Sequence, residues 1–214
     1  MYLNKDTGSI GISELIVFIA VILVAGITAS VLIAISSTLE TRSLSTGFQT
    51  TSEVSTALKI TDIEAHNTSG SIDKLLIAVT PRAGSTTIDF SSTFLELSNT
   101  SIKCIFNYTA GYWVDMTAGV DNLFSANAFP ASASRYGLVV LRDEDGSCTQ
   151  DNPLITAGDM IGITINTTAC FNGIGPNTRI NGLIVPEIGA GAVVAFQTPT
   201  TYAEEIFRLQ PIQT

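Results

Sequence analysis

Basic side chains are scarce in this chain of 214 residues. Ten Lys and Arg stand against nineteen Asp and Glu, which gives a formal net charge of −9 at pH 7. Binding to nucleic-acid phosphates needs clustered Lys and Arg, whereas these ten are scattered singly along the chain. A polybasic surface for anionic lipids is disfavoured for the same reason. We therefore expect no nucleic-acid partner.

Cysteine and histidine are also rare. The three cysteines, Cys104, Cys148 and Cys170, form no CxxC pair, and the single histidine, His66, has no cysteine near it in sequence. A zinc site is therefore disfavoured. One disulfide that leaves one free thiol is compatible with this set, and any of the three pairs could form it; three buried, reduced thiols are the alternative.

Motifs of catalysis are missing as well. The chain has no G-x-S-x-G, no glycine-rich phosphate loop and no metal triad. His66 lies beside Asn67-Thr68-Ser69 rather than in a Ser-His-Asp pattern. We predict that the chain is not an enzyme, and we assign no catalytic residue.

Charge is absent from Leu15 to Leu39, twenty-five residues that follow a short polar leader, Met1 to Gly8. About 20 apolar residues suffice for a helix to cross a bilayer. In an ordinary secretory signal the cleavage site follows the apolar region, but here the small residues Gly8-Ser9 precede it. Cleavage at that position would leave the apolar helix on the mature chain.

The sequence changes character near residue 60. Residues 9–59 contain no proline and predict one long helix. After it, short runs rich in Val, Ile, Thr and aromatics alternate with turn signals such as Asp145-Gly146, Asn172-Gly173 and Asn181-Gly182. The expected fold is α+β: a long N-terminal hydrophobic α-helix and an antiparallel, Ig-like β-sandwich head. The six predicted strands are 75–79, 93–97, 102–106, 137–141, 160–165 and 192–196.

The N-terminus resembles the class III signal peptide of archaeal flagellins (archaellins) and type IV pilin relatives. Gly8-Ser9 matches the cleavage site, and the block Leu15, Ile16, Val17, Phe18, Ile19 and Ala20 matches the start of their assembly helix. The family usually has two basic residues before the glycine, where this chain has Asp6-Thr7. The resemblance implies a cleaved leader (1–8), a polymerisation helix (9–59) and a head domain (60–214).

The head carries matches to the same family. Residues 136–147 and 151–159 resemble one of its strand-and-loop segments, and 185–189, 196–199 and Tyr202 resemble its C-terminus. The resemblance implies a self-assembling subunit of the archaellum filament, which serves swimming motility. It further implies a membrane-inserted precursor, a prepilin-type signal peptidase, the membrane platform of the archaellum motor and an extracellular filament, which other archaellins could share.

Two other functions remain open from the sequence. One is an archaeal type IV-like adhesion pilin, which would share the leader and helix. The other, from a different class, is a membrane-anchored extracellular binding module that stays monomeric. The resemblance of residues 136–159 to archaellin heads favours the motility filament over the adhesion pilin, and electron microscopy of material sheared from cells would distinguish a filament subunit from the monomeric module.

Two residues of the expected polymerisation helix carry separate hypotheses. Glu14 is the only charge between Ser9 and Leu39. It either interacts favourably with the helix dipole or meets the freed amino group of Ser9 on an adjoining subunit. Type IV pilins use a glutamate at mature position five in that way, whereas Glu14 would be at position six. Val24 lies mid-way along the uncharged run, in what we expect to be a dry filament axis.

Two modifications of the head are also expected. Four N-x-S/T sequons lie after residue 59 and none before, which favours N-glycans at Asn67, Asn99, Asn107 and Asn166. The acidic residues Asp143, Asp145 and Asp151 could supply oxygens to Ca²⁺, although they lack the EF-hand spacing. An Asp-Gly turn explains the same run. No other cofactor is expected.

Overall fold

This computed structural model describes residues 5–119 and 122–209, with side chains from residue 11 onward. The chain divides into two compact units, Met1–Thr50 and Thr51–Thr214. We describe each by itself.

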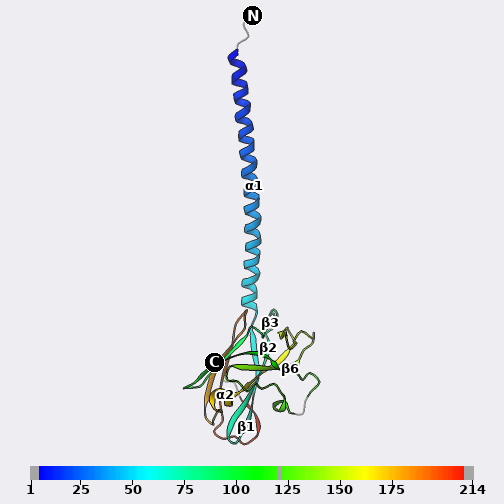
Figure 1. The fold of residues 1–214 in the computed structure, drawn as a ribbon, viewed down its shortest axis with the longest axis vertical. Helices are drawn as coiled ribbons and strands as arrows, with labels where there is room; N and C mark the ends of the chain where they lie inside the picture. The colour runs from blue at the N-terminus through cyan, green and yellow to red at the C-terminus, as the bar shows by residue number, and fades with distance from the viewer. Residues whose placement is uncertain (1–4, 120–121, 210–214) are drawn as a thin grey trace. The chain divides into compact units, whose positions relative to one another are not determined.

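Residues 5–50 of the first unit belong to helix α1, Lys5–Ser55 (Figure 1). At 1.5 Å per residue its 51 residues span roughly 76 Å. The helix ends at Ser55, four residues before the predicted end at Lys59. The reason lies in the packing that follows: Thr56 and Leu58 are buried, and Leu58 begins the first strand. Lys59 is therefore a strand residue.

The second unit is built on one nine-stranded sheet, in the order β10-β9-β4-β5-β6-β8-β2-β1-β11. Every neighbouring pair is antiparallel except β5 and β6, which are parallel. The strands are β1 Leu58–Thr68, β2 Ser71–Pro81, β4 Phe94–Ser98, β5 Lys103–Asp115, β6 Arg135–Arg142, β8 Met160–Asn166, β9 Arg179–Val185, β10 Ala192–Gln197 and β11 Ile206–Leu209.

Smaller elements complete this unit. Strands β3 (Ile88–Asp89) and β7 (Leu154–Ile155) form a separate two-stranded sheet. A 3₁₀ turn covers Leu123–Ser125, and the short helix α2 covers Thr167–Phe171. The sequence predicted no helix here; Asn166 starts α2 because its side chain accepts hydrogen bonds from the backbone N–H groups of Thr168 and Ala169.

The large sheet carries one main hydrophobic core and two smaller hydrophobic clusters. Strands from both ends of its order contribute to the same cluster, with Phe196 from β10 and Leu209 from β11. Tyr136, Phe90 and Phe106 are the largest of its fully buried side chains. A sheet whose two ends share one core must curl on itself, which explains how a single sheet gives the layered, mostly antiparallel head that the sequence predicts.

All six predicted strands are present, but one turn signal is wrong. Asn181-Gly182 lies inside β9 instead of at a turn. Gly182 is needed there for close approach, because a Cβ at this position would lie 2.1 Å from the backbone oxygen of Glu96 on β4. Asn172 and Gly173, by contrast, do form a turn, with φ values of 57° and 86°. Strands β1, β9 and β11 were not predicted.

Candidate functional site

The apolar surface of α1 is the most prominent feature of the first unit. Its large apolar side chains from Ile12 to Leu39 are between 49% and 71% exposed, and Val24 is 64% exposed. Burying one such side chain yields about 1.5–3 kcal/mol, so the sixteen of them supply on the order of tens of kcal/mol for association. This stretch is long and apolar enough to cross a membrane.

Two threonine hydroxyls in this stretch are hydrogen-bonded within their own helix. The Thr28 hydroxyl donates to the backbone oxygen of Val24 at 2.7 Å, and the Thr38 hydroxyl donates to that of Ala34 at 2.9 Å. Such bonds to the preceding turn leave the hydroxyl without a need for water. These two threonines are therefore compatible with burial in lipid or against other helices.

The predicted leader, residues 1–8, is described only in part. Residues 1–4 lie outside the described residues, and for Gly8 and Ser9 the structure gives only a helical backbone within α1. Glu14 is exposed, as are Leu15, Ile16, Val17, Phe18 and Ile19 after it. The processing site and the role of Glu14 thus remain predictions from the sequence.

The four sequon asparagines have different environments. The side-chain oxygens of three of them accept backbone N–H groups: Asn67 from Gly70, Asn99 from Ser101 and Ile102, and Asn166 from Thr168 and Ala169. Each amide nitrogen, the atom that would carry a glycan, has no part in these contacts. Asn107 is exposed within β5.

The structure selects one cysteine pair. Cys104 on β5 and Cys170 on α2 form a disulfide with a Cα–Cα distance of 6.4 Å, inside the usual range. Cys148 is free and buried. Burial raises the pKa of the Cys148 thiol to about 11, so it is protonated and unreactive at neutral pH.

Three carboxylates converge where the sequence indicated a cation site. Ligand oxygens of Asp143, Asp145 and Asp159 lie within 4.8 Å of one another, whereas Asp151 is exposed and outside the group. Asp159 was missed because it follows the acidic run by many residues and is buried. Hard cations such as Ca²⁺ take oxygen ligands of this kind.

Backbone and hydroxyl groups already bind these carboxylates. Asp143 accepts the N–H groups of Gly146 and Cys148 at 2.9 and 3.1 Å, and Asp159 accepts that of Thr156 at 2.7 Å. Hydrogen bonds, first from the Ser147 hydroxyl and then from that of Thr156, lower the pKa of Asp145. The three residues therefore suit either of the two readings, a turn or a cation site.

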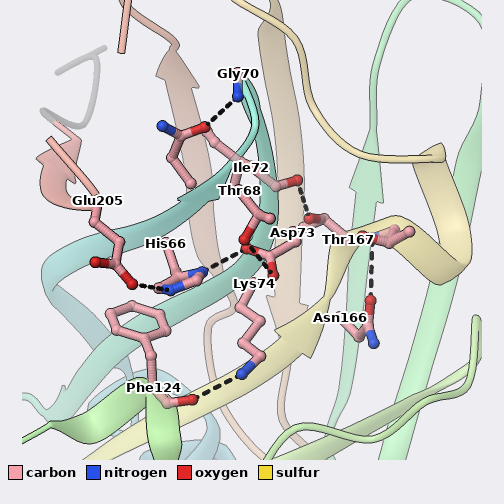
Figure 2. Close-up of polar contacts among 12 residues, drawn as sticks. His66, Thr68, Gly70, Ile72, Asp73, Lys74, Phe124, Asn166, Thr167 and Glu205 are labelled. Atoms are coloured by element: carbon pink, nitrogen blue, oxygen red, sulfur yellow. Dashed lines mark hydrogen bonds and ion pairs between the residues drawn. The ribbon is translucent and has the colours of Figure 1, made fainter. Parts of the chain in front are cut away.

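Sequence reasoning also missed a polar junction around His66 (Figure 2). The Nδ1 atom of His66 lies 2.6 Å from Asp73 on β2, and Nε2 lies 3.1 Å from Glu205 just before β11. Nearby, the Lys74 ammonium donates to the backbone oxygen of Phe124 at 2.8 Å. His66 therefore links the first hairpin to the segment just before the last strand.

Comparison with known proteins decides the family. The family model for archaeal-type flagellin matches residues 8–196. The chain belongs to the archaeal-type flagellin family. It is 36% identical to flagellin B2 of Methanocaldococcus jannaschii over 213 residues, which cover 98% of each chain. It is 38% identical to flagellin B5 of Pyrococcus abyssi over 219 residues, 95% of this chain and 99% of the relative.

Solved structures of archaeal flagellins share its fold. The crystal structure of archaeal flagellin FlaB1 from M. jannaschii superposes with a TM-score of 0.65 at 32% identity, covering 74% of this chain and 99% of that one. The subunit in the archaeal flagellum of Methanospirillum hungatei superposes with a TM-score of 0.63 at 14% identity, covering 92% of this chain and 98% of that one. The α+β prediction is thereby confirmed.

Proposed function

We infer that this chain is a structural subunit of an archaeal flagellar filament that serves swimming motility. The observation that carries this inference is the continuous apolar surface of α1 from Ile12 to Leu39, whose large side chains stay exposed because no other part of the described chain covers them. A helix of this kind is stable outside lipid only when other copies cover it, and contacts between unlike surfaces of identical copies generate open helical filaments. Membership in the archaeal-type flagellin family supports the same role.

The inferred partners follow from this role. The chain assembles with itself and with other archaeal flagellins in an extracellular filament. Before assembly, α1 holds the precursor in the cytoplasmic membrane, where a prepilin-type peptidase cleaves after Gly8. The motor platform in the membrane then receives the mature subunit. The family match extends through the head to residue 196, which favours this role over that of an adhesion pilin or a monomeric binding module.

Two modifications belong to the same proposal. The sequon asparagines lie on the head, with Asn107 exposed on β5, so we include N-glycans on the outer surface of the filament. The carboxylates of Asp143, Asp145 and Asp159 would hold a Ca²⁺ ion, which would cross-link the two ends of the loop between β6 and β8. Neither is needed for the assembly role.

The test is to shear filaments from cells, identify the protein of which they are made and determine the N-terminal residue of its subunits. We expect filaments made of this chain, each subunit beginning at Ser9, and we expect deletion of the chain to abolish swimming. Gly8→Val should leave an unprocessed precursor in the membrane, because a branched side chain obstructs a peptidase that selects glycine. Gly11→Ala is the matched control: no atom lies within 4 Å of its added Cβ, so processing should continue.

Subunits that retain Met1, or that begin inside the apolar run, would contradict the processing proposal. Cells that swim normally without the chain, or sheared material that lacks it, would contradict the filament role itself.

A further inference from the structure

A row of exposed apolar side chains crosses four neighbouring strands of the head. Val193 on β10 pairs with Leu183 on β9, Leu183 pairs with Glu96 on β4, and Glu96 pairs with Ile105 on β5. Residues that pair directly across strands point to the same face of the sheet. Val193, Leu183 and Ile105, which we name the apolar row, are 60%, 36% and 50% exposed.

The next line of this face extends the apolar surface. Phe94 pairs with Val185 on one side and with Asn107 on the other. Phe94 and Val185 are half-buried, so the apolar row is backed by two further apolar side chains. Asn107, a sequon asparagine, lies at the end of this line, beside the strand position of Ile105.

The single charge within the row is already compensated. The Glu96 carboxylate lies 2.6 Å from the Lys103 ammonium on the neighbouring strand. Covering the row would therefore not leave an unpaired buried charge, the main penalty for burying a carboxylate. This neutrality matters because the chain as a whole carries a net charge of −9, so identical heads repel one another at most other places.

The row also lies near the point where the head begins. The connection between β9 and β10 joins the strands of Leu183 and Val193, and it rests on Thr56, the residue that follows α1. The Ala190 N–H donates to the Thr56 backbone oxygen at 2.9 Å. A side chain at Gly189, where φ is +97°, would lie 2.2 Å from that oxygen. The connection that joins two strands of the row is thus bound to the segment that follows α1.

We propose that the apolar row is a contact surface for the head of a second copy of this chain in the filament, which rests on the filament role inferred above. A surface of a few exposed side chains covers on the order of a few hundred Å², less than the roughly 800 Å² per partner of a stable interface. The contact therefore forms only after α1 has brought copies together and raised their effective concentration.

The test is the reactivity of engineered cysteines toward a maleimide in intact filaments and in filaments dissociated with detergent. Val193→Cys and Ile105→Cys place thiols on the row. Ile206→Cys is the control, because Ile206 is 37% exposed but lies on β11, which pairs with β1 and with none of the four strands of the row. The native cysteines give little background, since Cys148 is buried and the other two form a disulfide.

The expected result is that labelling of Val193→Cys and Ile105→Cys is severalfold lower in filaments than in dissociated chains, whereas labelling of Ile206→Cys changes little. Equal labelling of row and control in filaments would overturn the proposal. Protection that persists in dissociated chains and is lost in Asn107→Gln would show that a glycan covers the row, and would overturn it as well.

Charge substitution gives a second readout that does not need a labelled filament. Val193→Asp should reduce filament yield, while Ile206→Asp should not; equal yields would overturn the proposal. Formation of the Cys104–Cys170 disulfide, seen on non-reducing gels, reports that the variant heads fold. Absence of filaments from the parent chain would refute the filament role, whereas filaments with a freely labelled row would refute this contact alone.

Discussion

Replacing Tyr136 by Phe tests the core of the head with the removal of a single oxygen. Tyr136 is fully buried on β6, and the single proton of its hydroxyl is shared between the backbone oxygens of Phe90 and Thr93, at 2.8 and 3.0 Å. These bonds fix the segment between β3 and β4 to the sheet. Tyr136→Phe keeps the ring but leaves both carbonyl groups without this donor.

The size of the effect follows from these two bonds. A buried polar group left without its partner costs about 1–3 kcal/mol, so we expect Tyr136→Phe to lower the free energy of unfolding by that amount. For a unit of this size each kcal/mol corresponds to roughly 2–4 °C in Tm. The expected decrease in Tm is therefore about 2–12 °C, measured by near-UV circular dichroism of the full chain in detergent.

The same residue predicts how stability depends on alkaline pH. Burial raises the pKa of Tyr136 well above its usual value. A group whose pKa is higher in the folded state stabilises the fold fully below its unfolded pKa, about 10 for tyrosine, and this contribution is lost as pH rises toward the folded pKa. The parent chain should lose stability above pH ~10, and Tyr136→Phe should lose less.

Tyr202→Phe is the control for this experiment. Tyr202 is half-buried, and its hydroxyl donates one bond, to the backbone oxygen of Ile174 at 3.1 Å. Its loss should lower Tm by less than the loss of the Tyr136 hydroxyl. A Tm for Tyr136→Phe equal to that of the parent, or above that of Tyr202→Phe, would refute the reasoning.

Three further predictions concern the helix, the thiols and the carboxylates. Val24→Leu should still give filaments on electron micrographs, whereas Val24→Asp, which costs about 2.5–3.5 kcal/mol on membrane insertion alone, should give none; filaments from both would contradict a dry axis. Thiol titration of the denatured, unreduced chain should find one thiol, Cys148, and a count of zero or three would contradict the pairing. Ca²⁺ should raise the Tm of the parent chain, and a chelator should reverse this rise, whereas the Tm of Asp159→Asn should not change with Ca²⁺. A parent chain whose Tm does not respond to Ca²⁺ would exclude the ion.

Local sequence patterns predicted the elements whose own residues specify them. The uncharged run after Glu14 predicted α1, and the mostly apolar runs 75–79 and 160–165 predicted β2 and β8. The composition of each of these strands is apolar enough to predict that the strand is buried. Strand β9 was missed because Asn181-Gly182 is a strong turn signal locally, and only the approach of β4 to Gly182 explains the glycine.

Features that join distant parts of the chain could not be read from the sequence. Three cysteines allow three pairs, and only the packing of α2 on the sheet brings Cys170 to Cys104. His66 and Glu205 are 139 residues apart and meet because β11 pairs with β1. The apolar row likewise needs the register of four strands, since Val193, Leu183 and Ile105 lie in three separate apolar runs of the sequence.

The central claim is that α1 holds the filament together. Electron cryo-microscopy of filaments sheared from cells tests it most directly, because the position of every subunit's helix can be traced in the map. We predict that the residues from Leu15 to Leu39 of all subunits form a continuous bundle at the filament axis, with Val24 covered by neighbouring helices and no water-filled channel. A hollow axis, or filaments in which this stretch remains exposed, would contradict the account.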